Sequence, residues 1–330
     1  MTSLPVCSHP ASNGLLFWAL AYKASDLLFE MMRVGVLGKL ETGSRLEALS
    51  RDFQLDAVAL QAAMVLLRKA GVVAQDGDVL RLTTGAIDLL PWLKVESVLR
   101  RWHEEHRSLT RAFSGDASGD PLDHIDDPEF FTAYADAMSR QNRVLALYIL
   151  KICCPRPGAR LLDLGAADGA VTIELLARIA DASALLVDRA ALQESAHRRI
   201  ARSGLGEHVR FVACDLRQRD GLPQVLAEAD LTLMLNIAHL LPGPALDGML
   251  NALADGLRPG AALVVYDQFA DSPCESVGVS DLLLVDWLMC GTSFADSAET
   301  FAGRLEKRCF HEVQVRLFPR LPGAFVTALR

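Results

Sequence analysis

The sequence lacks an excess of basic residues and lacks any long hydrophobic run. Among its 330 residues, Lys and Arg number 33 and Asp and Glu number 41, which gives a formal net charge of −8. Nucleic acid and anionic membrane surfaces both favour clustered Lys and Arg, so we expect neither as the main partner. No apolar run approaches the roughly 18 to 20 residues that span a bilayer, and the opening MTSLPVCSHP has no basic region followed by an apolar core. We therefore expect a soluble, cytoplasmic protein that acts on a small molecule.

Cysteine is not arranged for cross-linking or for metal binding. The 7 cysteines are odd in number and include no C-x-x-C pair, so they indicate neither a disulfide framework nor a zinc site. The stretch RWHEEHR, residues 101–107, gathers histidines and glutamates, but its spacing is not H-E-x-x-H. A charged helix face explains it better, and we expect no metal.

The first 90 residues predict a small helical domain that ends in a hairpin. Helical spacing extends over LLFWALAYKASDLLFEMMRVGVLGKL, SRLEALSRDFQL and DAVALQAAMVLLRKAGVVAQ, and the short β pattern GDVLRLTT follows. Asp56 is a suitable N-cap for the third helix, and Gly71 is a suitable stop. Three helices followed by a hairpin are typical of a winged helix. Residues 91–150 are helical again, interrupted by the polar loop SGDASGDPLDHIDDPE, and link this domain to the next.

From residue 151 the pattern changes to short apolar strands that alternate with helices. The strand-like stretches are ARLLDLG, SALLVD, VRFVACD, LTLMLN and AALVVYD, followed by HEVQVRLF and GAFVTALR. Five alternations predict an α/β fold with a doubly wound, Rossmann-like, mostly parallel sheet. The last two strands predict an antiparallel pair that closes the sheet.

Acidic residues stand at the ends of four of these strands. The first strand ends at Asp163, the second at Asp188, the third at Asp215 and the fifth at Asp267. Ligands of open parallel sheets bind at the carboxyl ends of the strands, so these side chains are candidates for one site. An acid after the second strand is well placed for the hydroxyls of a ribose. Asp215 could then accept a hydrogen bond from an exocyclic amine such as that of adenine.

The turn after the first strand discriminates between nucleoside cofactors. It has the sequence GAADG, residues 165–169. A dinucleotide requires G-x-G-x-x-G and a nucleoside triphosphate requires G-K-[ST], and this turn has neither. The carboxylates of Asp163 and Asp168 would repel a phosphate at the turn, but they suit the ammonium and sulfonium groups of S-adenosylmethionine. The sequence therefore predicts S-adenosylmethionine as the cofactor.

The motifs also resemble those of a known family. LLDLGAADG, LLVD, VACDL, LTLMLNIAHLL and LRPGAALVVYD are similar to the successive motifs of class I S-adenosylmethionine-dependent methyltransferases. The N-terminal part, ending in AGVVAQDGDVLRLTT, resembles the winged-helix dimerisation domain of the O-methyltransferases of the plant caffeate and hydroxyindole types and of bacterial natural-product pathways. The resemblance covers the chain from about residue 15 to residue 330. It implies a three-part organisation: a dimerisation domain over 1–90, a helical linker that contributes to the acceptor pocket over 91–150, and a catalytic domain over 151–330.

The resemblance implies a set of cofactor-binding residues. It places Gly165 at the donor turn, Asp188 on the ribose, and Asp215 with Leu216 around the adenine. In the helix FFTAYADAMSRQN, Met138 approaches the reacting methyl group and Asn142 the methionine end of the donor. The remaining positions expected at the cofactor are Asp163, Ala166, Arg189 and Asn236.

The resemblance also implies an acceptor pocket and a base. Phe130, Tyr134, Met138 and Trp287 are expected to line the pocket, whose apolar and aromatic character suits a flat, hydrophobic secondary metabolite. The implied base is His239, shortly after the fourth strand, and Asp267 after the fifth strand orients it. The implied reaction is methyl transfer to a hydroxyl of that metabolite.

The sequence departs from the family pattern at two positions, and three alternative functions remain: methylation of carbon or nitrogen, a non-methylating reaction, and DNA-binding regulation. Ala167 replaces the middle glycine of D-x-G-x-G-x-G, and the second acid that flanks the base has no clear counterpart, with Ser293 or Asp296 nearest. Relatives can methylate carbon or nitrogen, or catalyse hydroxylation, decarboxylation or cyclisation. A winged-helix regulator is the third alternative, but residues 1–100 hold ten basic and ten acidic side chains and the would-be recognition helix is apolar.

The first helix predicts a homodimer. LLFWALAYKASDLLFEMMRVGVL has more apolar positions than one face of a single helix requires. A second copy of the chain is expected to cover the remainder.

Overall fold

The structure, a computed structural model, describes residues 11–114, 127–218, 222–241, 243–269, 279–289, 296–318, 321 and 323–330. The chain divides into two compact units, residues 1–97 and 98–330. The boundaries expected after residues 90 and 150 both fall inside helices, α5 (Thr84–His106) and α7 (Pro128–Cys153). Within the described ranges, no helix combines the length and the apolar character that a bilayer-spanning segment requires.

The first unit combines short helices with a three-stranded antiparallel sheet. Its core is formed by apolar side chains of the helices and of the sheet, among them Leu37, Leu49, Met64 and Leu80. The sheet has the order β1-β3-β2, so a short strand before α3 completes the predicted hairpin. The elements are α1 (Ala11–Arg33), α2 (Val36–Thr42), β1 (Ser44–Arg45), α3 (Leu46–Asp52), α4 (Ala57–Lys69), β2 (Val73–Asp76) and β3 (Val79–Leu82).

Two glycines and one N-cap residue determine where helices of this unit begin and end. The single long helix predicted at the start is wrong, because Gly35 has φ 88° and separates α1 from α2. A Cβ at Gly35 would also lie 3.1 Å from the ring of Phe53. The predicted N-cap is confirmed, because Asp56 Oδ1 accepts from the Ala59 N–H at 2.8 Å. Gly71, with φ 73°, follows the end of α4 as expected.

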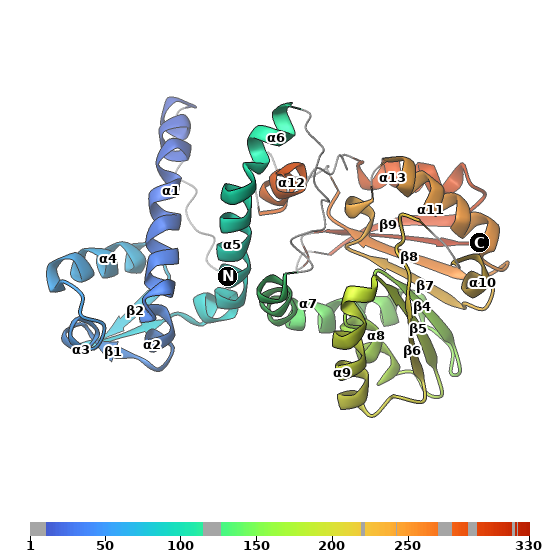
Figure 1. The fold of residues 1–330 in the computed structure, drawn as a ribbon, viewed down its shortest axis with the longest axis horizontal. Coiled ribbons are helices and arrows are strands. Elements are labelled where there is room, and N and C mark those ends of the chain that lie inside the picture. Colours follow the sequence, from blue (N-terminus) through green and yellow to red (C-terminus); the bar gives the residue numbers. More distant parts are fainter. Residues whose placement is uncertain are drawn as a thin grey trace. The chain divides into compact units, whose positions relative to one another are not determined.

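The second unit is organised around a mixed seven-stranded sheet with the order β6-β5-β4-β7-β8-β10-β9 (Figure 1). The strands from β6 to β8 are parallel, and β10 pairs antiparallel with both β8 and β9. The predicted α/β fold and its closing antiparallel pair are therefore confirmed. The strands are β4 (Arg160–Leu164), β5 (Ser183–Asp188), β6 (Val209–Ala213), β7 (Leu231–Leu235), β8 (Ala262–Asp267), β9 (His311–Leu317) and β10 (Ala324–Leu329).

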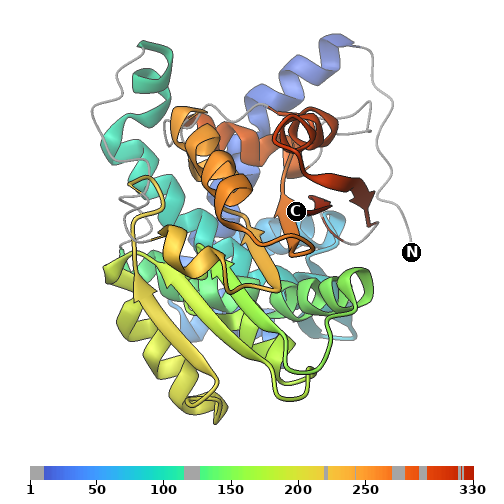
Figure 2. The same ribbon diagram turned by 90° about the vertical axis from the view of Figure 1, so that its right-hand side faces the viewer.

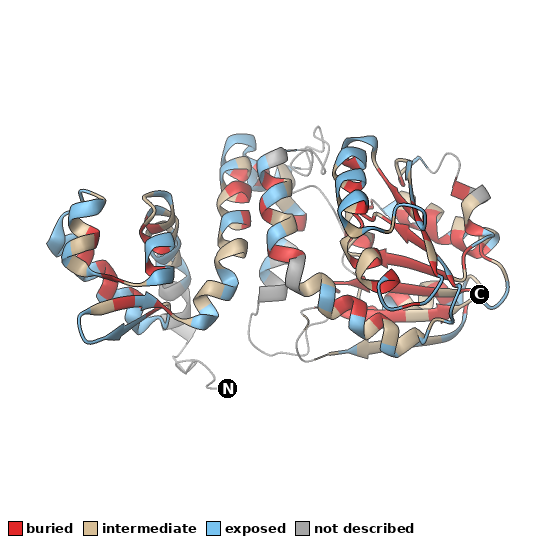
Figure 3. Cartoon of the chain, turned by 90° about the horizontal axis from the view of Figure 1, so that it is seen from below, coloured by how far each residue is buried: buried red, intermediate tan, exposed pale blue. Residues whose placement is uncertain are grey.

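Helices cover both faces of the sheet (Figure 2), its strands are largely buried (Figure 3), and each face has its own core. Alternate strand residues supply the two faces: Leu162 and Val265 belong to one cluster, and Leu161 and Val264 belong to the other. The first cluster packs against α11 and α13, and the second packs against α7 and α8. The helices beyond α5 are α6 (Ser108–Ser114), α7, α8 (Ala170–Leu176), α9 (Gln193–Ser203), α10 (Leu222–Leu226), α11 (Gly243–Gly256), α12 (Val279–Met289) and α13 (Ala298–Glu306), with single turns at η2 (Ala190–Leu192) and η3 (Ala238–Leu240).

The strand order reverses direction between β4 and β7. The chain runs from β4 outward through β5 to β6, then returns to β7 on the other side of β4 and continues to β8. Such a reversal opens a crevice at the carboxyl ends of the central strands, where ligands of doubly wound sheets bind. The turn after β4 and the segment after β7 both begin at this edge.

Candidate active site

The turn after β4 is shaped by two glycines in tight surroundings. Gly165 has φ 74°, and its N–H donates to the carbonyl of Val187 at 2.8 Å. A Cβ at this position would lie 2.6 Å from the side chain of Ile237. Gly169 has φ 80°, and a Cβ there would lie 2.4 Å from Leu186. Because each position requires both a left-handed backbone and the absence of a side chain, these glycines fix the path of the turn.

Ala167 stands where the family pattern has its middle glycine. It has φ 50°, a left-handed conformation that costs an L-residue about 1 to 2 kcal/mol. Its N–H donates to Asp188 Oδ2 at 2.7 Å, and Oδ1 of the same carboxylate accepts from the Arg189 N–H at 2.7 Å. Asp188 is the last residue of β5, as predicted, and is buried. The acid expected to bind ribose therefore also ties the turn to β5 and supports the strained alanine.

Asp163 lies deeper than the sequence suggested. It was expected to end its strand, but β4 continues to Leu164, and the Asp163 side chain is 3% exposed. Its Oδ2 accepts a hydrogen bond from Thr172 Oγ1 at 2.6 Å. Burial raises the pKa of Asp163 to about 7; the Thr172 bond opposes this rise, while the nearby charges of Asp188 and Asp168 add to it. A carboxyl that titrates near neutrality thus lies directly beneath the turn.

Two further acids at this edge are paired with arginines. Asp168 accepts from Arg199 at 2.6 Å. Asp215 follows β6 by two residues, because the strand ends earlier than expected, and its carboxylate is bonded by Arg217 at 2.7 Å. The hydrogen bonds from Arg217 hold the pKa of Asp215 below its ordinary range, and the charge of Arg189 adds to this effect. Asp215 therefore stays ionised at neutral pH.

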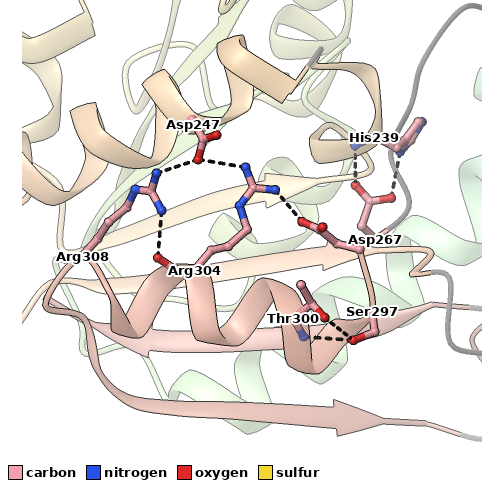
Figure 4. A network of polar contacts seen from close by, with 8 residues as sticks. His239, Asp247, Asp267, Ser297, Thr300, Arg304 and Arg308 are labelled. Carbon is pink, nitrogen blue, oxygen red and sulfur yellow. Dashed lines mark hydrogen bonds and ion pairs between the residues drawn. The ribbon is translucent and has the colours of Figure 1, made fainter.

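The predicted base and its acid meet at the end of the neighbouring strands. His239 lies in η3 after β7, and Asp267 is the last residue of β8 and is completely buried. Their side chains join through His239 Nδ1 and Asp267 Oδ1 at 2.8 Å, and Asp267 Oδ2 accepts from the His239 backbone N–H at 3.2 Å (Figure 4). The Gln268 N–H also donates to Oδ1, at 2.8 Å. A carboxylate held in this way fixes one tautomer of the ring and leaves Nε2 for chemistry.

Aromatic side chains surround this pair. The indole of Trp287, in α12, stacks on the imidazole of His239 with a centroid distance of 4.2 Å. Tyr134, in α7, stacks on Phe130 at 5.7 Å. Burial raises the pKa of Tyr134 to about 12, with a further contribution from the charge of Asp267, so the phenol lies near the acid and stays neutral. Of the residues predicted for the acceptor pocket, Trp287 contacts the base and Tyr134 lies near Asp267, with Phe130 stacked on Tyr134.

The remaining predicted residues lie on the expected elements, and their roles stay predictions. Met138 is buried in α7, and Asn142, one turn further along, is half-buried. Asn236 follows β7 with φ 55°, and its N–H donates to Tyr266 O at 2.7 Å. Leu216 belongs to the core cluster. Ala166 lies in the turn, where its N–H approaches Val187 O at 3.3 Å.

Sequence reasoning missed a buried tyrosine next to the acid. Tyr266 precedes Asp267 in β8 and is fully buried on the opposite face of the sheet. Its hydroxyl accepts from the Gly323 N–H at 3.1 Å, and a Cβ at Gly323 would lie 2.3 Å from Asp267 O. The strand pattern AALVVYD gave a signal, because a tyrosine in a buried strand requires a polar partner.

Asp296, one of the two residues nearest to the position of the missing second acid, forms an ion pair away from the base. It pairs with Arg304. Arg304 also contacts Asp247 (Figure 4). Arg308 contacts the same Asp247 at 2.6 Å. Asp296 therefore belongs to an ion-pair network at the start of α13, and Ser293 lies outside the described residues.

The stretch RWHEEHR forms the end of α5. Glu104 pairs with Arg100, and His106 stacks on Trp102 at 4.4 Å. His103 is buried and lies 3.6 Å from Asp286 of α12. In the part of the chain that the structure describes, no group of three or more His, Cys, Asp or Glu side chains is arranged to hold a metal ion.

Comparison with known proteins agrees with this architecture. Residues 161–260, which include the donor turn and His239, match the family model described as a methyltransferase domain. No curated protein is significantly similar to the chain. Residues 161–260 therefore resemble a methyltransferase domain, and the chain as a whole shares the fold of the solved structures described below. The solved structures that share this fold include methyltransferases, and the similarity extends over the N-terminal unit.

Three solved structures illustrate the similarity. An O-methyltransferase family protein from Burkholderia thailandensis has a TM-score of 0.76 and 16% identity, covering 98% of this chain and 99% of that one. The pyocyanin biosynthetic protein PhzM has a TM-score of 0.75 and 20% identity, covering 97% and 99%. Human N-acetylserotonin methyltransferase, solved in complex with S-adenosylmethionine, has a TM-score of 0.67 and 15% identity, covering 99% of each chain. At these identities the likeness establishes the fold.

Proposed function

We propose that this protein transfers a methyl group from S-adenosylmethionine to a hydroxyl group of a small, largely hydrophobic aromatic molecule, with His239 as the general base. The observation that supports this most strongly is the buried pair of His239 and Asp267, joined at 2.8 Å at the edge of the sheet that carries the donor turn. A histidine oriented by a carboxylate is suited to take a proton near neutral pH.

The turn residues fit a positively charged donor. Asp163, Asp168 and Asp188 lie close together, since the charges of the last two raise the pKa of the first. Arg199 pairs with Asp168. A ligand that brings an ammonium and a sulfonium group would offset the remaining negative charge, whereas a phosphate would add to it. Asp188 retains acceptor capacity for ribose hydroxyls, because each carboxylate oxygen can accept two hydrogen bonds.

The chemical step requires a base because the acceptor starts out protonated. A phenol with a pKa near 10 is mostly neutral at pH 7. When bound, the donor supplies a methyl group carried on a sulfonium. In the complete step the O–H bond of the acceptor and the S–C bond of the donor break, while an N–H bond forms on His239 Nε2 and an O–C bond forms on the acceptor. The positive charge that was on sulfur therefore ends on the imidazole.

The acceptor is expected to lie among the aromatic side chains around the base. Phe130 and Tyr134 stack on one another in α7, and Trp287 stacks on the base from α12. These buried rings favour a flat apolar molecule, and Met138, buried in the same helix, adds apolar surface.

An assay with purified protein tests this function. The protein, S-adenosylmethionine and a panel of phenols, aromatic amines and carbon acids should give S-adenosylhomocysteine together with an O-methylated phenol, identified by mass spectrometry. Methylation confined to the amines or carbon acids would contradict transfer to oxygen. Donor binding without any release of S-adenosylhomocysteine would favour a non-methylating reaction instead.

Replacement of Asp188 by alanine is expected to weaken donor binding by roughly ten- to a hundred-fold. The variant loses a charge-assisted hydrogen bond to ribose, worth about 1.5 to 3 kcal/mol, and also the bond that holds Ala167 in its left-handed conformation. Isothermal calorimetry with S-adenosylmethionine measures the effect. Asp181→Ala is a control, because Asp181 lies two residues before β5, at the opposite end of that strand from Asp188. An unchanged dissociation constant in Asp188→Ala would contradict the assignment.

A homodimer formed through the first unit is part of the proposal. In α1 the side chains of Trp18, Leu20 and Tyr22 are 53%, 42% and 57% exposed, more apolar surface than a helix in water normally presents. Sedimentation velocity at micromolar concentration should show a dimer, and Trp18→Glu with Tyr22→Glu should shift it to a monomer. A wild-type chain that sediments as a monomer would refute this expectation.

A further inference from the structure

The imidazole of His239 is covered on one face by the indole of Trp287. The two ring centroids lie 4.2 Å apart, and the ring planes are inclined by only 15°. Trp287 is 9% exposed and the His239 side chain 11%, so the stack is largely shielded from water. The bond from His239 Nδ1 to Asp267 lies at the edge of the ring. The indole is therefore a separate contact, on the face of the base rather than at its edge.

The helix that carries Trp287 also contacts α5. Asp286, the preceding residue of α12, lies 3.6 Å from Nε2 of His103, which is buried in α5. This contact joins α12 to α5 one residue away from the indole that stacks on His239.

Among the described residues, a carboxylate and an indole face contact the imidazole of His239. Asp267 approaches from β8 at the ring edge, and Tyr134 from α7 is a neutral phenol near that acid. Asp286 is paired with His103. A cation within about 6 Å of an indole face is attracted by the ring, and the attraction grows when water is excluded. The imidazole becomes a cation in the chemical step described above, where the indole faces it.

We propose that Trp287 is a positioning residue for the base: it restricts the orientation of the imidazole that is bonded to Asp267, and its indole face stabilises the imidazolium that forms when His239 takes the proton of the acceptor. This inference rests on the proposed function for its role in catalysis. The electrostatic interaction itself is a property of the protein without substrates.

Two variants separate the charge effect from simple packing. Trp287→Phe and Trp287→Met both remove part of the side chain, but only phenylalanine keeps an aromatic face. The titration of the His239 ring is followed by NMR on ¹³C-labelled histidine, with its resonance assigned by comparison with His239→Ala. The pKa of His239 is expected to be highest in the wild type, lower in Trp287→Phe and lowest in Trp287→Met. The full difference should be roughly one unit.

The chain contains a matched control. Trp102 stacks on His106 in the same parallel manner, at 4.4 Å and 21°, but His106 is exposed. Trp102→Met should shift the titration of His106 by less than Trp287→Met shifts that of His239, because water screens the exposed stack. Equal pKa values of His239 in Trp287→Phe and Trp287→Met would overturn the proposal, and so would a shift of His106 in Trp102→Met as large as that of His239 in Trp287→Met.

Activity adds a second readout. The acid limb of kcat/KM against pH should move to lower pH in Trp287→Met, with a lower plateau, while donor affinity stays the same. An unmoved limb would refute the catalytic role. The NMR titration requires neither donor nor acceptor, so failure of the proposed O-methylation and failure of the stacking proposal can be told apart.

Discussion

Replacement of His239 by alanine is expected to lower turnover by about 10²- to 10⁴-fold, the usual contribution of a general base. The alanine variant still binds donor and acceptor, because the donor turn is supported by Asp188 and not by the imidazole. The acceptor hydroxyl then keeps its proton until solvent removes it. The measurement is kcat and KM with a phenolic acceptor, together with the donor dissociation constant, which should change little. His311→Ala, at an exposed position of β9, serves as the control variant.

Asp267→Asn is expected to cost less than the loss of the base. The amide cannot hold the same tautomer of His239 as strongly, but the imidazole ring and its stack on Trp287 remain.

If His239→Ala turned over normally from pH 6 to pH 9, the enzyme would act by proximity alone or would methylate an atom that needs no base. Such a result would contradict the base assignment without contradicting the methyltransferase fold.

The buried carboxyl of Asp163 is expected to make the free energy of unfolding depend on pH. Its pKa is about 7 in the folded protein and 3.8 in the unfolded reference, so the folded state binds the proton more tightly. The free energy of unfolding should therefore fall as pH rises from about 4 to about 7 and level off above that, by at most about 4 kcal/mol at 1.36 kcal/mol per pKa unit. Asp163→Asn removes this group and should flatten that part of the curve. Chemical denaturation at a series of pH values measures both proteins.

Thr172→Val gives the matched test of the same carboxyl. The Thr172 hydroxyl opposes the rise of the Asp163 pKa, so its removal should extend the falling part of the stability curve to higher pH. Equal pH dependence for the wild type and Asp163→Asn would show that Asp163 is ionised in the folded protein.

The sequence was sufficient for the sheet because strand burial follows a local pattern. Each of the seven predicted apolar stretches forms a strand, and helices connect most of them. The first helix was predicted less well, since apolar periodicity continues through Gly35 and does not reveal that its backbone turns left-handed. Strand ends were predicted within one or two residues. This accuracy placed Asp188 and Asp267 correctly at the ends of their strands, but it placed Asp163 at the end of β4 although the strand continues to Leu164.

Contacts between distant segments could not be predicted in this way. The stack of Trp287 on His239 joins positions that are far apart in the chain, and only the packing of α12 brings them together. Likewise, no local signal indicates that Asp296 pairs with Arg304 rather than flanking the base. Residue type and position after a strand indicate a candidate site residue. The ion-pair partner of that residue, however, depends on the tertiary structure.

The close approach of Gly165 and Ile237 has a consequence for how this enzyme can diversify. Any side chain at residue 165 would overlap Ile237, which stands two residues before His239. Because the backbone at residue 165 is also left-handed, a smaller side chain at 237 would relieve the overlap but not the backbone strain, so we expect glycine to persist at 165. The turn after β4 and the segment that leads to His239 are therefore constrained as one unit.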